Sequence, residues 1–263
     1  MNPYCSRPVV LCLSGHDPSG GAGLQADIEA LQAQGCHAAP VITALTLQDT
    51  CNVHDFRVLD SDWVQAQVRC LLADLPVAAV KLGMLGSVAM LDTILDLLEQ
   101  LPGVPVVCDP VLTAGGGGPL GQQELVDALA RRLLPRVTLA TPNLPEARML
   151  AGLPEGSTDD CARSLLEQVP HLLITGGHGD ESRVHNRYYS REGARQTFIC
   201  PRLPGSYHGS GCTLASTLAG RLALGQALPG ALDTALDYTW RTLRDAEAPG
   251  RGQYIPRRLP LDL

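Results

Sequence analysis

Lysine is almost absent from this chain of 263 residues. Lys81 is the single lysine, so nearly all of the 20 basic side chains are arginines. Acidic residues outnumber them and give a formal net charge of −7, which argues against nucleic acid or an anionic membrane as a main partner. Almost any side chain that binds phosphate must therefore be arginine.

The chain also lacks long apolar runs and clustered cysteines. No stretch approaches the roughly 20 apolar residues of a membrane span. The first apolar run ends at Gly15-His16-Asp17, which is not the layout of a signal peptide. The nine cysteines are scattered, with no Cys-x-x-Cys pair and no zinc spacing. We interpret the protein as cytoplasmic.

Short apolar runs alternate with segments of helical period. The runs are continuously apolar, as in strands covered on both faces, and predict strands at 9–15, 39–46, 78–84, 104–111, 137–143 and 171–177. Apolar residues at helical spacing predict helices at 23–35, 61–75, 87–101, 122–134 and 158–170. This order predicts an α/β fold with a mostly parallel central sheet and helices on both faces.

The last third has a different pattern. Two strand-like runs within 184–205 flank a turn at residues 191–193 and predict a short antiparallel hairpin at the sheet edge. Two helices are expected at 211–225 and about 229–247. Because no linker or internal repeat interrupts the chain, we expect residues 1–263 to form a single domain.

Each of the six predicted strands ends in glycine or polar residues. Their carboxyl ends meet along one edge, where doubly wound sheets bind ligands, so we expect one long cleft there. The glycine-rich loop after the first strand lacks the G-x-G-x-x-G spacing, and GSGC at 209–212 lacks the Walker A lysine. The turn at 209–211 instead predicts an anion site of backbone amides, which suits phosphoryl transfer.

Cys212 follows this turn directly. A helix start favours the thiolate, although position alone also allows a small residue that packs well. The order of "LSGHDPSGGAGLQADIEALQAQGCHAAPVITALTLQDT", "VKLGMLGS", "CDPVL", "TPNLPEA", "TGGHGD" and "HGSGCTLASTLAG" resembles the hydroxymethylpyrimidine/phosphomethylpyrimidine kinases of the ribokinase-like superfamily. The resemblance covers about residues 9–240.

The resemblance implies a kinase of thiamine biosynthesis. ATP would phosphorylate 4-amino-5-hydroxymethyl-2-methylpyrimidine and then its monophosphate, giving the diphosphate. The acceptor ring would be contacted by Gly15, Asp27, Gln48 and Val111. An amide at Gln48 suits an aminopyrimidine edge because it offers a donor and an acceptor. Gln48 as a loop cap and Asp27 as an acid near a helix start remain the simpler alternatives.

The resemblance also implies ATP and Mg²⁺ as cofactors. Asn143 and Glu146 match an Asn-x-x-Glu element that holds Mg²⁺ and phosphate largely through water, and Asp109 ends a strand close by. Glu146 has the alternative role of an acid at a helix start. Thr175 and Gly177 are expected at the nucleotide, although relatives commonly carry lysine at the position of Thr175.

Cysteine at position 212 differs from the aspartate base of the superfamily's sugar kinases. The resemblance makes Cys212 a base or an acceptor-positioning group, assisted by Gly209, Ser210 and Gly211. A thiol can be neutral or ionised, so we expect it to tolerate both the alcohol and the anionic monophosphate. A fixed carboxylate would repel the monophosphate.

The missing lysines leave open what binds the phosphates. Arg183, Arg187 and Arg202 are candidates, and Lys81 is expected to be a buried structural charge paired with a carboxylate. The glycines at 115–118 are interpreted as a flap over the acceptor. The family usually forms homodimers. A pyridoxal or pyridoxine kinase is the nearest alternative function, and a non-catalytic ligand-binding protein on the same fold is a second.

Overall fold

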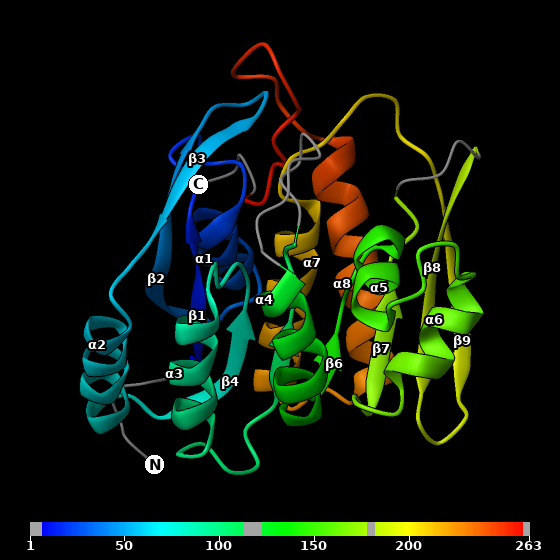
Figure 1. Ribbon diagram of the computed structural model, residues 1–263. Helices are drawn as coiled ribbons and strands as arrows, with labels where there is room; N and C mark the ends of the chain where they lie inside the picture. The colour runs from blue at the N-terminus through cyan, green and yellow to red at the C-terminus, as the bar shows by residue number, and fades with distance from the viewer. Residues whose placement is uncertain (1–6, 113–122, 178–181, 260–263) are drawn as a thin grey trace.

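One sheet runs through the part of the chain that the computed structural model describes, residues 7–112, 123–177 and 182–259 (Figure 1). Its strand order is β3-β2-β1-β4-β5-β6-β7-β8-β9. Strands β1, β2, β4, β5, β6 and β7 are parallel, and β3, β8 and β9 add antiparallel pairs at the two ends. The strands are β1 (Val9–His16), β2 (His37–Gln48), β3 (Val53–Val58), β4 (Val77–Leu82), β5 (Val106–Cys108), β6 (Leu139–Ala140), β7 (His171–Ile174), β8 (Arg183–Ser190) and β9 (Arg195–Pro201).

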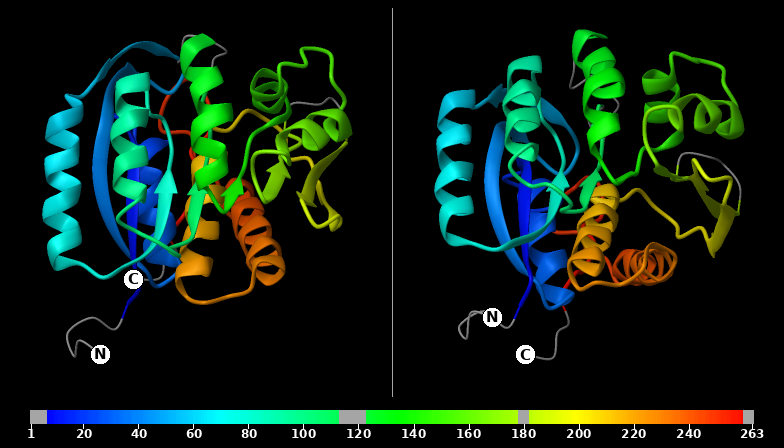
Figure 2. Two further views of the ribbon diagram at one scale, coloured as in Figure 1. Left: turned by 60° about the horizontal axis from the view of Figure 1, so that its bottom comes forward. Right: turned by 90° about the horizontal axis from the view of Figure 1, so that it is seen from below.

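Helices cover both faces of the sheet, as predicted (Figure 2). One face packs against α2 (Ser61–Asp74), α3 (Val88–Leu98), α4 (Gln123–Ala128), α5 (Leu144–Ala151) and α6 (Thr158–Leu165). The other face packs against α1 (Gly23–Ala33), α7 (Ser210–Ala223) and α8 (Leu228–Arg244). Each face therefore has an apolar core of its own.

The continuous apolar run of β1 follows from this arrangement. Successive side chains of a strand point to opposite faces. Val9, Leu11 and Leu13 accordingly enter the core beneath α2 and α3, and Val10 and Cys12 enter the core beneath α1 and α7. All five side chains are at most 1% exposed, so both faces of this part of the strand are covered by apolar core.

The connections change face between β1 and β4. The chain leaves β1 through α1 on one face and reaches β4 through α2 on the other. Ligands of doubly wound sheets bind at such a switch point, outside the carboxyl ends of the strands. The start of α7 lies at the same edge, because a Cβ added to Gly211 would be 3.3 Å from the carboxylate of Asp109, directly after β5.

The structure departs from the sequence-based prediction in four places. Strand β3 and helix α5 were not expected, and β6 has only two residues. A single α-helix was expected at 122–134. In the structure the α-helix ends at residue 128 and is followed by a π turn over Leu129–Leu133 and a 3₁₀ turn over Leu134–Arg136. Pro135 lies within the 3₁₀ turn and lacks the N–H that would continue an α-helix there.

The hairpin of β8 and β9 and its turn match the expectation. Within the described residues, no helix combines the length and the apolar character that crossing a membrane requires.

Candidate active site

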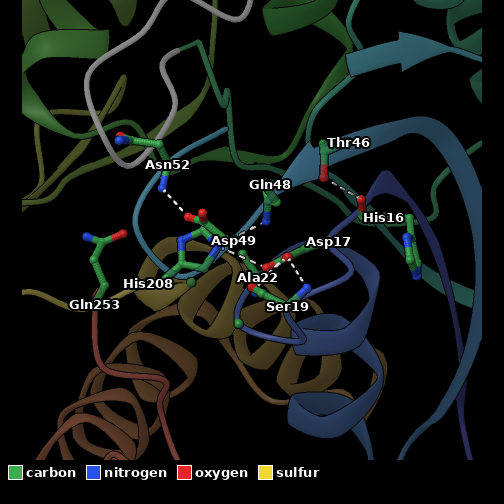
Figure 3. A network of polar contacts seen from close by, with 12 residues as sticks. His16, Asp17, Ser19, Ala22, Thr46, Gln48, Asp49, Asn52, His208 and Gln253 are labelled. Carbon is green, nitrogen blue, oxygen red and sulfur yellow. Dashed lines mark hydrogen bonds and ion pairs between the residues drawn. The ribbon is translucent and has the colours of Figure 1, made fainter. Parts of the chain in front are cut away.

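The first loop, after β1, is folded around the carboxylate of Asp17. Its Oδ1 accepts hydrogen bonds from the backbone N–H of Ser19 at 2.8 Å and from the Ser19 hydroxyl at 2.7 Å. Its Oδ2 accepts from the N–H of Ala22 at 2.7 Å and contacts Nε2 of His208 at 2.9 Å (Figure 3). A single buried acid therefore shapes this loop and attaches it to the segment before α7.

Gln48, at the end of β2, joins the same network. Its side-chain amide lies 3.3 Å from Nε2 of His208 (Figure 3) and close enough to Asp17 to lower the pKa of that acid. Because an ionised carboxylate can only accept, Nε2 of His208 carries the proton directed at Asp17. Burial would raise the pKa of Asp17, but hydrogen bonds from His208, Ser19 and Gln48 hold it well below its ordinary value. Gln48 thus lies where the first loop meets the segment that leads into α7.

Gly209, Ser210 and Gly211, predicted as an amide turn, form the start of α7. Gly209 is the N-cap residue, with φ of 81° and no side-chain cap. A Cβ there would overlap the carbonyl oxygen of Gly21 in the first loop, so only glycine fits. The first amides of α7 therefore have no side-chain acceptor at the N-cap, as an anion site requires.

Cys212 lies in the first turn of α7 and is 7% exposed. Its thiol lies beside the backbone N–H of Gly23, the first residue of α1, and beside the carboxylate of Asp109, since both groups act on the pKa of the thiol. Two helix starts therefore meet at the thiol. The start of α7 is expected to favour the thiolate when the alcohol is bound, and that expectation stays a prediction. Burial, with the charges of Asp109 and Asp27, raises the pKa of Cys212 to about 12, although Lys81 and the Gly23 N–H act in the opposite direction.

Lys81 is a buried structural charge, as predicted. Its Nζ lies 2.7 and 2.9 Å from the two carboxylate oxygens of Asp27, and both side chains are 0% exposed. Ser216 of α7 donates to the same carboxylate at 2.7 Å. The expectation that Asp27 contacts the acceptor ring is therefore not supported, because its carboxylate is committed to partners inside the protein. Asp27 holds α1, β4 and α7 together instead.

Asp109 and Glu146 supply two buried carboxylates, each 5% exposed. Glu146 caps α5: its carboxylate accepts from the N–H of Asn143 at 3.0 Å, and the Asn143 side chain accepts from the N–H of Glu146 at 2.9 Å. Burial raises the pKa of both acids, and the charge of Asp109 raises that of Glu146 further.

This donor set fits a divalent cation. Among the residues described, no three His, Cys, Asp or Glu side chains gather as a metal cage. Mg²⁺ commonly takes only one or two carboxylates and keeps several waters, which matches a pair such as Asp109 and Glu146. Bound there, it would neutralise two carboxylates that burial disfavours as charged groups. The helix-capping role of Glu146 and a metal role are compatible.

Gly15 and Val111, predicted at the acceptor ring, lie at one small apolar cluster. Buried Ala44 and Met84 form its centre, and Val111 packs against them. A Cβ added to Gly15 would be 3.3 Å from the sulfur of Met84, so the backbone of β1 packs directly against this apolar cluster. Gly15 and Val111 thus border the same apolar cluster, and Gln48 lies farther along β2.

Thr175 and Gly177, predicted at the nucleotide, follow β7. Thr175 forms an isolated parallel bridge with Asn143. Arg202, one of the three candidate arginines, donates to the carbonyl of Gly177 at 2.9 Å. Arg187 is directed elsewhere and donates to Thr158 of α6 at 3.2 Å. The glycines at 115–118 lie outside the described residues.

Comparison with known proteins gives this geometry a family. A sequence profile of the family described as phosphomethylpyrimidine kinase matches residues 17–257. The chain belongs to the phosphomethylpyrimidine kinase family. The hydroxymethylpyrimidine/phosphomethylpyrimidine kinase of Haemophilus influenzae is 36% identical over 237 residues, which cover 87% of this chain and 88% of that protein.

Solved structures agree with the phosphomethylpyrimidine kinase family and its ribokinase-like fold. A phosphomethylpyrimidine kinase from Clostridium difficile 630 matches with a TM-score of 0.77 and 30% identity, covering 89% of this chain and 98% of that chain. The pyridoxal kinase from Staphylococcus aureus in complex with AMP-PCP and pyridoxal matches with a TM-score of 0.88 and 25% identity, covering 97% and 94%.

Two residues of this phosphomethylpyrimidine kinase site were missed in the sequence. His208 stands directly before the glycine turn, and this position is a signal that could have been used. Arg258 lies in the proline- and arginine-rich tail, yet its guanidinium donates to the carbonyl of Gly21 in the first loop. No local pattern around Arg258 indicates such a contact.

The buried ion pair generates a stability prediction. Lys81→Met leaves the carboxylate of Asp27 without a counter-ion in the core, and we expect the free energy of unfolding to fall by about 3–5 kcal/mol. In Lys81→Met/Asp27→Asn the amide carries no charge and still accepts from Ser216, so more than half of this loss should be recovered. Urea unfolding measures both.

The control is Arg241→Met, which breaks the exposed pair of Arg241 with Asp237 and should cost less than about 1 kcal/mol. If the double variant is no more stable than Lys81→Met, the loss in Lys81→Met does not come from the unpaired charge of Asp27.

Proposed function

We propose that this chain transfers the γ-phosphoryl group of ATP to the hydroxymethyl oxygen of 4-amino-5-hydroxymethyl-2-methylpyrimidine, and then a second phosphoryl group to the resulting monophosphate, in thiamine biosynthesis. The observation that carries this proposal is the placement of Cys212 directly after the amide turn at 209–211 and beside Asp109, in a chain of this family. Each step forms one bond from the acceptor oxygen to phosphorus and releases ADP.

In the proposed arrangement the acceptor lies over the apolar floor below Gly15. Val111 would pack on the ring, and the amide of Gln48 would pair with the aminopyrimidine edge. As a neutral thiol, Cys212 would position the acceptor hydroxyl by a hydrogen bond. It would take the hydroxyl proton only as the thiolate, after its own proton has left, and the start of α7 favours that form. Asp27 would not contact the acceptor and would instead hold in place helix α1, which carries Gly23.

The donor would be bound on the other side of the amide turn. We assign the nucleotide contacts to Asn143, Thr175 and Gly177, and the binding of Mg²⁺ to Asp109 and Glu146. A divalent cation there supplies charge stabilisation for the phosphates during transfer. The support is that the bridge between Asn143 and Thr175 lies next to the acid that caps α5.

Pyridoxal kinase is the second candidate activity. The observation in its favour is the TM-score, which is 0.88 against the pyridoxal kinase from Staphylococcus aureus and 0.77 against the phosphomethylpyrimidine kinase from Clostridium difficile. Sequence identity has the opposite order, 25% against 30%. Pyridoxal also carries a hydroxymethyl group on a flat ring, so both acceptors fit the same chemistry.

We further propose a cytoplasmic homodimer in which residues 1–263 form one domain. Leu45 and Leu47 of β2 are 44% and 64% exposed at the hairpin with β3. Apolar side chains of one strand that face solvent together are typical of a surface covered by a partner. A second copy of the chain is the partner we expect.

Product analysis tests the function. The protein is incubated with Mg-ATP and either the hydroxymethylpyrimidine or pyridoxal, and the products are separated by chromatography. We expect the pyrimidine monophosphate first and the diphosphate later, with pyridoxal phosphorylated at a lower rate. Turnover of pyridoxal alone would replace the proposal with the second candidate, and no turnover on either acceptor would refute both.

Cys212→Asp tests why a thiol stands at this position. A carboxylate adds a fixed negative charge beside the acceptor, which repels the monophosphate but not the alcohol. We expect kcat/KM for the monophosphate to fall at least about tenfold more than for the alcohol. Cys70→Asp, at an exposed cysteine of α2, is the control. Equal losses on both acceptors, or a faster second step, would show that charge is not the reason.

Light scattering tests the dimer. The wild-type protein should have twice the mass of the 27.9 kDa chain. Leu47→Glu should shift it toward the single-chain mass, because a charge would be buried without a partner at the interface. A single-chain mass for the wild type at micromolar concentration would refute the homodimer.

A further inference from the structure

The segment after α8 crosses the site edge of the sheet (Figure 1, red). At the tip of the β2–β3 hairpin, Thr50 accepts from the backbone N–H groups of Gln253 at 2.8 Å and Gly252 at 3.1 Å. Tyr254 then pairs with the chain before α7: its N–H donates to Ser206 at 2.8 Å, and its carbonyl accepts from the N–H of His208 at 2.9 Å. The tail therefore joins the end of β2 to the segment that enters the phosphate turn.

Arg258 ends this crossing with a fully buried guanidinium, 0% exposed. Its Nε donates to the hydroxyl of Thr213 at 2.8 Å, and Nη2 donates to the carbonyl of Gly21. Thr213 in turn donates to the carbonyl of Gly209 at 2.8 Å. A Cβ added to Gly209 would lie 2.8 Å from Nη2. The cation is packed directly against the N-cap of α7.

The charge of Arg258 is only partly balanced. Its ion-pair partner is Glu29 of α1, at 3.0 Å, which is 27% exposed and so shares its charge with water. An arginine in a protein stays protonated. The single lysine is committed to Asp27, and acids predominate around Cys212. Arg258 thus places a permanent positive charge behind amides that otherwise rely on their dipoles alone.

We propose that Arg258 is a positioning residue for phosphoryl transfer. It holds the turn at 209–211 against the first loop, and it supplies positive charge to this turn, since the only lysine of the chain is paired with Asp27. The inference rests on the proposed kinase function. The ligand it concerns is the terminal phosphate of a nucleoside triphosphate, which reaches the turn, whereas a diphosphate ends one phosphate short.

Two variants of one ion pair separate charge from structure. Arg258→Gln and Glu29→Gln break the same contact, but the first removes the positive charge behind the turn and the second removes the charge that offsets it. Calorimetric titration with AMP-PCP and with ADP, and the melting temperature, are measured for each. Arg257→Gln is the control, because Arg257 is next in the chain and its ion pair is with Glu247.

We expect Arg258→Gln to weaken AMP-PCP binding about tenfold more than ADP binding. Glu29→Gln should leave AMP-PCP binding unchanged or tighter, although both variants lose melting temperature. Arg258→Lys should recover AMP-PCP affinity toward the wild type, since it restores the charge with fewer contacts. This variant also serves if Arg258→Gln does not fold.

Two results would overturn the inference. Equal weakening of AMP-PCP binding in Arg258→Gln and Glu29→Gln, in proportion to lost stability, would make Arg258 a structural residue only. Unchanged AMP-PCP binding in Arg258→Gln would exclude a charge effect. Failure of the wild type to bind either nucleotide would instead refute the kinase function on which the inference rests, so the two failures are distinguishable.

Discussion

The ion pair of Lys81 and Asp27 is the constraint on which the site depends. Removing two charges from water costs several kcal/mol per ion, and only close, well-oriented partners offset that cost. Both side chains are 0% exposed, so neither has water as a substitute partner. With Ser216 on the same carboxylate, the pair fixes β4, α1 and α7 relative to one another. These elements carry or border the first loop, the acceptor floor and the phosphate turn.

The pair also determines the charge balance around the reacting groups. Lys81 pairs directly with Asp27 and offsets the charge of Asp109 only in part, so burial still raises the pKa of both Asp109 and Glu146. The protein without ligands therefore has an excess of acid at the cleft. This excess of acid repels phosphate unless a cation binds together with the phosphate. The start of α7 offers backbone amides to the phosphate in place of a basic side chain.

Sequence patterns predicted the parts whose physics is local. The parallel strands were visible because burial on both faces leaves a continuous apolar run, and the turn of the β8–β9 hairpin because Gly193 marks it. Strand β3 was missed, since its residues are half-buried or exposed and carry little apolar signal. Helix α5 was missed although Asn143 and Glu146 form a capping box, a known helix-start signature, because the motif was assigned to Mg²⁺ and a helix start at Glu146 was kept only as the alternative.

The remaining part of the site depends on contacts between distant segments. Gly21 and Arg258 are 237 residues apart in the sequence, and Asp27 is 54 residues from Lys81. In the sequence, an acid in the first turns of a helix that follows a glycine-rich loop resembles a ligand-binding residue. Only the structure shows that the carboxylate of Asp27 is paired with Lys81. This is why Asp27 was assigned to the acceptor ring and Arg258 to no role. The structure places Gly15 and Val111 at one apolar cluster, and their role at the acceptor ring stays a prediction.

The same charge balance explains cysteine at position 212. The residue there lies against Asp109 and within the field of Asp27, and a single lysine opposes them. An aspartate would add a third carboxylate to a buried group that already disfavours ionised acids. A thiol fills the position without adding charge and lies beside the N–H of Gly23 and the carboxylate of Asp109. A site with so few basic side chains can therefore hold an anionic acceptor beside this residue only if the residue itself is able to remain neutral.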